Sequence, residues 1–148
     1  MLKHLLWVIL VAAAIGAHAE CQSAEERANR GDPTMHIHYV EIVCRDVAAQ
    51  CAALELVHGV SFGPPLADLG QARVAGAPDG SLIGVRAPLA EHEEPIIRTY
   101  LEVEDIAKSV QEAESAGAMI AYPPTRQGDT GTWAIYILGD VQIGLWQR

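Results

Sequence analysis

An internal repeat is the feature that most constrains how this chain can fold. Three kinds of landmark occur twice at nearly constant offsets of 59, 58 and 60 residues. They are an Asp that opens a helical pattern (Asp46, Asp105), a Gly that closes it (Gly59, Gly117) and a later Ile-Gly-hydrophobic run (residues 83–85 and 143–145). Agreement among three independent landmarks predicts two copies of one structural unit. We expect one domain over residues 35–148.

The second copy shows what the unit contains. Residues 96–103 alternate in polarity, which predicts a half-buried strand, and the Asp105 cap is followed by a single apolar stripe that predicts a helix. Further strand patterns cover residues 119–122, 132–138 and 141–146. The first copy begins in the same way, with a strand over residues 38–44 and a helix after Asp46. The sequence thus predicts two β-α-β-β-β repeats, over residues 36–87 and 96–147, joined by a connector at 88–95.

The N-terminal region has the pattern of an export signal. Residues 1–19 combine a basic start, an apolar run and an Ala17-His18-Ala19 cleavage motif, which predicts a secretory signal peptide. Alternatives are a retained anchor and lipidation at Cys21. A polar segment at 20–34 is expected to be a flexible leader. We therefore expect an exported protein, periplasmic or secreted, with no stable membrane insertion after processing.

Charge and cysteine content restrict the partners. The net charge is −9, and loss of Lys3 with the signal peptide would make it −10. No Lys/Arg cluster is present, so we expect no binding to nucleic acid. Cys44 and Cys51 fit strand and helix patterns as small buried residues, and the disulfide state of Cys21, Cys44 and Cys51 stays open.

The repeat and its motifs resemble a known superfamily. The stretch 100–106 (Tyr-Leu-Glu-Val-Glu-Asp-Ile), then 114–118 (Glu-Ser-Ala-Gly-Ala) and 144–147 (Gly-Leu-Trp-Gln), is similar to the glyoxalase/bleomycin-resistance/extradiol-dioxygenase, or vicinal oxygen chelate (VOC), superfamily. The resemblance implies an α+β fold, in which a curled mixed sheet with outer helices encloses a cup that binds small molecules. It also implies that the protein forms a homodimer.

The same resemblance implies where a metal would bind in metal-using members. The first-strand ligands fall on Tyr39 and Arg98, and the closing-strand acids fall near Ile83 or Gly84 and on Gly144. Neither Gly nor Arg can coordinate a divalent cation, and Tyr is a weak ligand. We therefore expect no metal and no cofactor, which disfavours glyoxalase I and metal-dependent dioxygenase activity.

Strand alternation indicates which side chains would face the cup. Successive side chains of a strand point to opposite faces of the sheet. If the residues that alternate with them face the helices, the side chains that point into the cup are Tyr39, Glu41, Arg98, Tyr100 and Glu102. Glu41 and Arg98 are the candidate catalytic pair, as base and as binder of a carboxylate or carbonyl group. Alternatively, the two side chains only neutralise each other, or this face is solvated.

Two further residues are candidates for ligand binding. Residues 122–132 form either a long loop that brings Arg126 over the cup or an ordinary connection stiffened by two prolines. Trp146 shares parity with Gly144 and is either a pocket residue or a core plug. His36 and His38 are expected on the helix side, as solvated side chains near the start of the first strand.

Two functions follow from these expectations. One is an exported, glyoxalase-like protein that binds a small molecule in a concave cleft, as bleomycin-resistance members of the superfamily do. The other is a metal-independent lyase or isomerase acting on a small carbonyl or carboxylate compound. A fold alone does not decide between them.

Overall fold

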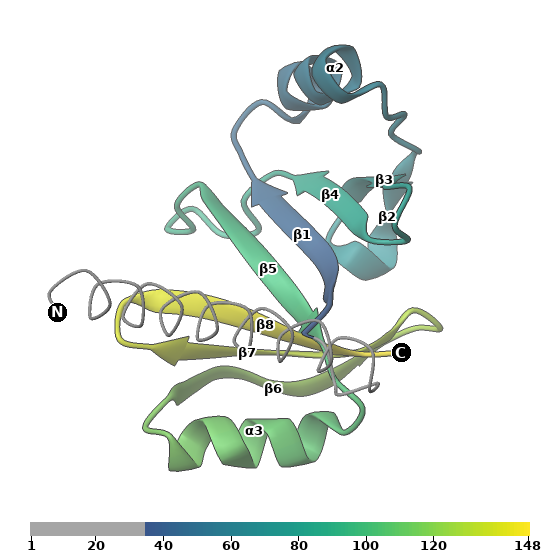
Figure 1. Ribbon diagram of the computed structural model, residues 1–148. Coiled ribbons are helices and arrows are strands. Elements are labelled where there is room, and N and C mark those ends of the chain that lie inside the picture. Colours follow the sequence, from purple (N-terminus) through teal and green to yellow (C-terminus); the bar gives the residue numbers. More distant parts are fainter. Residues whose placement is uncertain (1–34) are drawn as a thin grey trace, which may run out of the picture. The chain divides into compact units, whose positions relative to one another are not determined.

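The computed structural model describes residues 35–148, so the expected signal peptide and leader lie outside the described residues. The chain alternates strands and helices in two similar series (Figure 1). The first series is β1 (Ile37–Val43), α2 (Val47–His58), β2 (Pro65–Leu66), the short 3₁₀ turn η1 (Ala67–Leu69), β3 (Ala72–Gly76) and β4 (Leu82–Arg86). The second is β5 (Ile96–Glu102), α3 (Ile106–Ser115), β6 (Met119–Gln127), β7 (Gly131–Leu138) and β8 (Val141–Gln147).

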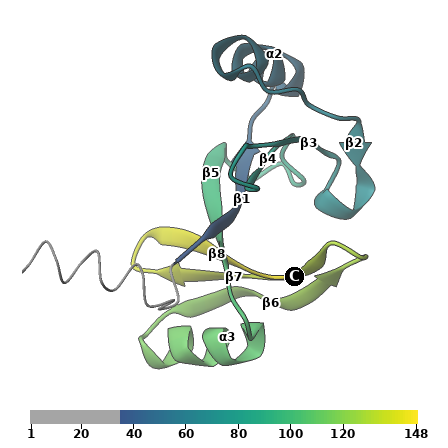
Figure 2. The ribbon, with the colours of Figure 1, turned by 45° about the vertical axis from the view of Figure 1, so that its right-hand side comes forward.

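All eight strands belong to one mixed, curled sheet in the order β2-β3-β4-β1-β5-β8-β7-β6. The two series meet at β1 and β5, which lie antiparallel and side by side at the centre in both views (Figures 1 and 2). Each central strand also pairs in parallel with the last strand of its own series, β1 with β4 and β5 with β8. The predicted α+β fold of two β-α-β-β-β repeats is confirmed.

The register at the centre of the sheet shows the twofold relation between the repeats. Across β1 and β5 the pairs are Tyr39 with Tyr100, Val40 with Thr99, and Glu41 with Arg98. The repeat offset of 59 residues relates Tyr39 to Arg98 and Glu41 to Tyr100, so the Tyr39–Tyr100 and Glu41–Arg98 pairs are equivalent. A local twofold axis therefore passes through the Val40–Thr99 pair, and it brings the corresponding faces of both repeats together.

Both helices begin as the sequence predicts. The Asp46 carboxylate accepts a hydrogen bond from Ala49 N at 2.9 Å, and Asp105 accepts one from Lys108 N at 3.0 Å. These are N-caps, which satisfy amide groups that have no partner within the helix. Gly59 ends α2 in the left-handed conformation. Helix α3 ends at Ser115, with Ala116 as its C-cap and Gly117 directly after it at a φ of 90°.

The sheet has two apolar clusters on the face that the helices cover and one on the opposite face. On the helix side, α2 covers a cluster around Cys51, Phe62 and Val85, and α3 covers one around Ile106, Val110, Ala134 and Leu145. Within the described residues, Cys44 and Cys51 are free thiols, and both pack in the α2 cluster. The opposite face carries a third cluster, formed by Tyr39, Tyr100, Ile135 and Trp146.

The expected long loop at 122–132 is wrong. Strand β6 continues to Gln127 and β7 begins at Gly131, so Arg126 lies exposed on a strand. Pro123 and Pro124 are tolerated there because β6 is an edge strand, whose outward N–H groups need no partner in the sheet. The ladder to β7 is irregular between Tyr122 and Thr125.

The expectation for His38 is also wrong. The pairing of β1 with β5 shifts between Ile37 and Tyr39, which marks a β-bulge at His38. His38 is 8 % exposed, and the centroid of its ring lies 5.2 Å from that of Trp146. A bulge reverses the alternation of side chains along a strand. Counting alternate residues from the centre of β1 therefore assigns His38 to the wrong face of the sheet. Burial lowers the pKa of His38, a shift that the nearby Glu102 partly opposes.

Over residues 35–148, neither helix is long and apolar enough to cross a membrane.

Candidate functional site

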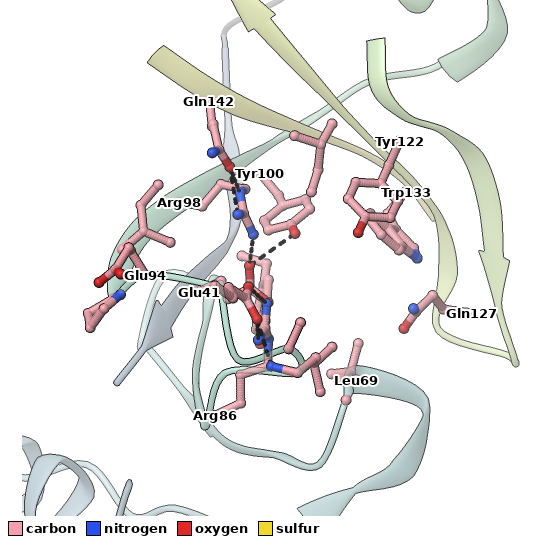
Figure 3. A pocket seen from close by; sticks show the side chains of 18 of the residues that line it. Glu41, Leu69, Arg86, Glu94, Arg98, Tyr100, Tyr122, Gln127, Trp133 and Gln142 are labelled. Carbon is pink, nitrogen blue, oxygen red and sulfur yellow. Dashed lines mark hydrogen bonds and ion pairs between the residues drawn. The ribbon is translucent and has the colours of Figure 1, made fainter. Parts of the chain in front are cut away.

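A cavity of about 650 Å³ lies on the face of the sheet opposite the helices. Side chains from β1, β4, β5, β6, β7 and β8 line it, together with η1 and the connector between the repeats (Figure 3). One side of the cavity is charged and the other is aromatic. The site therefore depends on both repeats.

Glu41 is the centre of the charged side. Its Oε1 accepts a hydrogen bond from Arg86 Nε at 2.7 Å, and its Oε2 accepts bonds from Arg98 Nη1 and, at 3.2 Å, from the Tyr100 hydroxyl. Glu41, Arg86 and Arg98 are each about 95 % buried, with 6 %, 5 % and 6 % exposed. Glu41 is thus a buried carboxylate with both oxygens occupied.

The two arginines are held by further partners. Arg86 donates to both carboxylate oxygens of Glu93, at 2.8 and 2.7 Å, and Arg98 donates from Nε and Nη2 to Gln142 Oε1 at 3.1 and 2.7 Å. Figure 3 shows the chain of bonds from Gln142 through Arg98 and Glu41 to Arg86. Two carboxylates neutralise two guanidinium groups, which makes burial of the charges tolerable.

Hydrogen bonding and burial shift several pKa values in the cavity. The Arg86 hydrogen bonds lower the pKa of Glu93 to about 2. Burial, and then the negative charge of Glu41, raise the pKa values of Tyr39 and Tyr100. Both phenols therefore stay protonated in the physiological range, as neutral groups that can donate a hydrogen bond.

Tyrosine rings fill the space beside Gly84 and Gly144, and the superfamily resemblance would place metal-binding acids near Ile83 or Gly84 and on Gly144. A Cβ atom added at Gly84 would overlap the ring and hydroxyl of Tyr39, and one added at Gly144 would overlap the ring of Tyr100. Arg98, at a third ligand position, is ion-paired to Glu41. Within residues 35–148, no group of three His, Cys, Asp or Glu side chains has the geometry to hold a metal ion. This set of donors does not fit a divalent cation.

The aromatic side of the cavity consists of packed rings. The Tyr39 and Tyr100 centroids lie 5.5 Å apart, Trp146 lies 5.7 Å from Tyr39, and Trp133 lies 6.3 Å from Tyr100. Tyr122 packs against Trp133 at 5.5 Å. Trp146 donates its indole N–H to the Thr130 carbonyl at 3.2 Å, so its polar atom has a structural role. Such a surface favours a flat, apolar ligand.

The structure places five of the seven predicted site residues around the cavity: Tyr39, Glu41, Arg98, Tyr100 and Trp146. The other two lie elsewhere. Glu102 pairs with Arg148 at 2.7 Å, near the histidines at the start of β1, and Arg126 is exposed on β6. Glu102 has the predicted parity but lies too close to the end of its strand to reach the cavity.

Sequence reasoning missed several lining residues. Gln142 lies two residues before Gly144, and Arg86 lies two residues after Gly84, so strand parity was sufficient to find both. Gln127 follows from the true extent of β6, which the two prolines obscured, and Trp133 lies in a strand that the sequence predicted. Glu93 lies in the connector, where no periodic pattern places a side chain.

No protein-family model matches the sequence, and no curated protein matches it. Several solved structures are similar to it in fold. The chain is similar to methylmalonyl-CoA epimerase from Mycobacterium tuberculosis, with a TM-score of 0.60 and 20 % identity over 76 % of this chain and 87 % of that one. A hypothetical protein from Bacillus halodurans C-125 gives a TM-score of 0.63 and 13 % identity, over 78 % and 95 % of the two chains.

A glyoxalase/bleomycin resistance protein/dioxygenase superfamily member from Vibrio splendidus 12B01 gives a TM-score of 0.56 and 16 % identity, over 78 % of this chain and all (100 %) of that one. These similarities, with the repeat and the sheet order, show that the chain has the glyoxalase/VOC fold. At such low identities they show the fold alone.

Proposed function

We propose that this is an exported, glyoxalase-like protein that binds a small molecule in the cavity without a metal ion. The observation that carries the proposal is the cavity itself, whose charged groups bind one another while aromatic rings form the opposite wall. Its volume of about 650 Å³ is within the range common for ligand pockets, roughly 300–1,000 Å³. Aromatic surface supplies affinity, and a small number of polar atoms supply specificity.

Two parts of this proposal rest on the sequence. Export rests on the signal pattern at residues 1–19. We also propose that the protein forms a homodimer, which rests on the superfamily resemblance. Export is tested by the intact mass of protein recovered from a periplasmic fraction, which should begin at Glu20.

The second candidate is a metal-independent isomerase or lyase acting on a carbonyl or carboxylate compound. The position of Glu41 and Arg98 in the cavity favours it, as does the similarity to an epimerase. However, Glu41 is ion-paired to both arginines, and Arg98 also donates to Gln142, so transfer of a proton to Glu41 would weaken two buried ion pairs. A substrate carboxylate would compete with Glu41 and Gln142 for Arg98. Both steps would weaken buried ion pairs or hydrogen bonds, so binding is the better-supported function.

Calorimetry on the purified full-length protein tests the proposal. A panel of neutral, anionic and cationic aromatic and aliphatic compounds should include members that bind one per chain. Leu69→Trp should block this binding, because Leu69 lines the cavity (Figure 3), whereas Leu138→Trp makes the same change at an exposed site outside it and should not. If no compound binds, or if both variants bind equally well, the proposal is wrong.

Proton exchange separates binding from catalysis. We expect the protein not to accelerate the uptake of deuterium from D₂O next to the carbonyl group of methylmalonyl-CoA or of simple carboxylic acids, as followed by NMR against a sample without protein. Deuterium uptake that Glu41→Gln abolishes, in a variant that still melts cooperatively, would favour the enzyme instead.

A further inference from the structure

The outer side of helix α2 is apolar although it is exposed. Helix α2 lies at the outside of the first repeat (Figures 1 and 2), and its side chains Leu56 and Val57 are 87 % and 71 % exposed. A surface helix normally carries polar side chains on the side away from the core. Here six exposed apolar residues form one continuous stripe, which we call the α2 face: Ala48, Ala49, Ala52, Ala53, Leu56 and Val57.

The second repeat provides an internal comparison. The offset of 59 residues matches the α2 face to positions of α3 that are also exposed. Four of these positions are polar in α3, and two of them, Lys108 and Glu112, form a surface ion pair at 3.8 Å. The polar residues that correspond to Ala49, Ala52, Ala53 and Leu56 are Lys108, Gln111, Glu112 and Ser115. The fold therefore does not require an apolar outer side on this helix, and continuous exposed apolar surface indicates contact with another molecule.

The charges near the α2 face indicate which partner fits. Residues 47–58 contain one acidic side chain, Glu55, and no Lys or Arg. A helix that lies in a membrane surface typically carries Lys or Arg beside its apolar stripe, which α2 lacks. The whole chain has a net charge of −9, so two copies repel each other, and the uncharged α2 face adds nothing to that repulsion.

The α2 face is complementary in shape to itself when two copies lie antiparallel. Its alanines occupy the N-terminal part of the stripe, and Leu56 and Val57 occupy the C-terminal part. A twofold axis near residues 52 and 53 would place Leu56 opposite the partner's Ala49 and Val57 opposite the partner's Ala48. Large side chains thus meet small ones, as in the packing of ridges into grooves.

The same arrangement is complementary in charge at both ends of the helix pair. Arg45 and Asp46 are exposed just before α2, and His58 is exposed at its end. The Arg45 side chain is 81 % exposed, and its 3.9 Å contact with Glu94 is at the surface. In an antiparallel pair, Asp46 would lie near the partner's His58. Arg45 would lie near the carbonyl end of the partner helix, which carries a partial negative charge.

We propose that two copies of this chain associate through their α2 faces, with the two helices antiparallel about a twofold axis. The inference rests on the homodimer in the proposed function and specifies its surface. Helix α2 has 12 residues and is about 18 Å long, so a contact centred on one helix pair is smaller than most stable interfaces. We therefore expect a dimer that dissociates on dilution in the micromolar range.

Sedimentation-velocity ultracentrifugation tests the surface, with protein recovered from the periplasmic fraction at a series of concentrations. Leu56→Glu should weaken the dimer by at least about tenfold, because it buries a charge against the partner. Ser115→Glu is the control, since it introduces the same charge at the equivalent exposed position of α3 and should change nothing. A wild type that stays monomeric at every concentration would overturn the inference. A dimer that both variants weaken equally, or that neither weakens, would also overturn it.

A charge pair tests the antiparallel arrangement. Ala49→Lys gives α2 the residue that α3 has at this position, and alone it should also weaken the dimer. The double variant Ala49→Lys, Leu56→Glu would place each new Lys opposite a new Glu of the partner, and should bind itself at least about tenfold more tightly than either single variant. High salt should reduce this recovery. A parallel pair would bring like charges together, so a double variant no better than the single ones contradicts the proposal. All variants should melt cooperatively, and Ala49→Lys keeps the test valid if Leu56→Glu does not fold.

Two further measurements separate this inference from a membrane contact and from the proposed function. A monomeric wild type that binds vesicles of phosphatidylethanolamine and phosphatidylglycerol, and loses this binding in Leu56→Glu, would replace the second copy with a lipid surface. Leu56→Glu should bind the same members of the ligand panel as the wild type, because the cavity lies on the other face of the sheet. Loss of the dimer therefore leaves ligand binding intact, and failure of the whole panel to bind would overturn the ligand-binding function and not the α2 contact.

Discussion

At the scale of single residues, two glycines decide what occupies the centre of the cavity. Gly84 pairs with Glu41 across β1 and β4, and Gly144 pairs with Tyr100 across β5 and β8, so they are equivalent positions of the two repeats. In each repeat the missing side chain leaves room for a tyrosine ring. The absence of a side chain at these two positions therefore makes room for the aromatic wall of the cavity.

Gly144→Ala tests this close approach. The added methyl group would overlap the Tyr100 ring, so we expect a loss of about 1–3 kcal/mol in the free energy of unfolding, as for other overpacked cores. Urea denaturation measures it. Gly76→Ala is the control, because a Cβ atom there meets nothing within 4 Å, and its effect should stay within about 0.5 kcal/mol. Equal effects of the two substitutions would contradict the packing described.

At the scale of elements, the helices follow local signals, whereas the edge strand follows its position in the sheet. Asp46 and Asp105 cap their helices as the sequence indicates. Strand β6 passes through two prolines, which local rules assign to a loop. Because only β7 pairs with β6, the sheet tolerates the missing N–H groups.

Asp105→Ala should reduce the free energy of unfolding by about 1 kcal/mol, since Lys108 N would lose its acceptor at the start of α3. Asp105→Asn keeps a side-chain oxygen at the same place and should recover most of the loss. Thermal and urea unfolding of the three proteins measure both effects. If Asn were as damaging as Ala, the aspartate would act through its charge and not as a cap.

At the scale of the whole described domain, the cluster of Glu41, Arg86, Glu93, Arg98 and Gln142 joins the two repeats. Its members come from β1, β4, the connector, β5 and β8. Replacing one charge leaves a buried partner uncompensated, at a cost of about 3–5 kcal/mol in other proteins. The same network positions the cavity walls, so stability and site geometry are coupled.

The domain should lose stability in acid as Glu93 is protonated. The folded pKa, about 2, is lower than the ordinary value of 4.5, so the unfolded chain binds more protons between these pH values. The stabilisation is therefore complete above pH 4.5 and lost as the pH falls toward 2, by roughly 3 kcal/mol in all. Urea unfolding at several pH values measures it. Glu93→Gln should flatten this dependence, and an unchanged slope would contradict the assignment to Glu93.

The sequence alone determined the repeat, the caps, most strands and the parity that sends Tyr39, Glu41, Arg98, Tyr100 and Trp146 to one face. These features depend on neighbours a few residues away, or on an offset that can be counted. Only the tertiary structure decided that Glu41 is shared between two arginines, that tyrosine rings fill the space beside Gly84 and Gly144, and that Gln127 and Trp133 face the cavity. The physical reason is that each of these contacts joins residues brought together by strand pairing, bulges and edge position, which act across the sheet and leave no periodic signal in the chain.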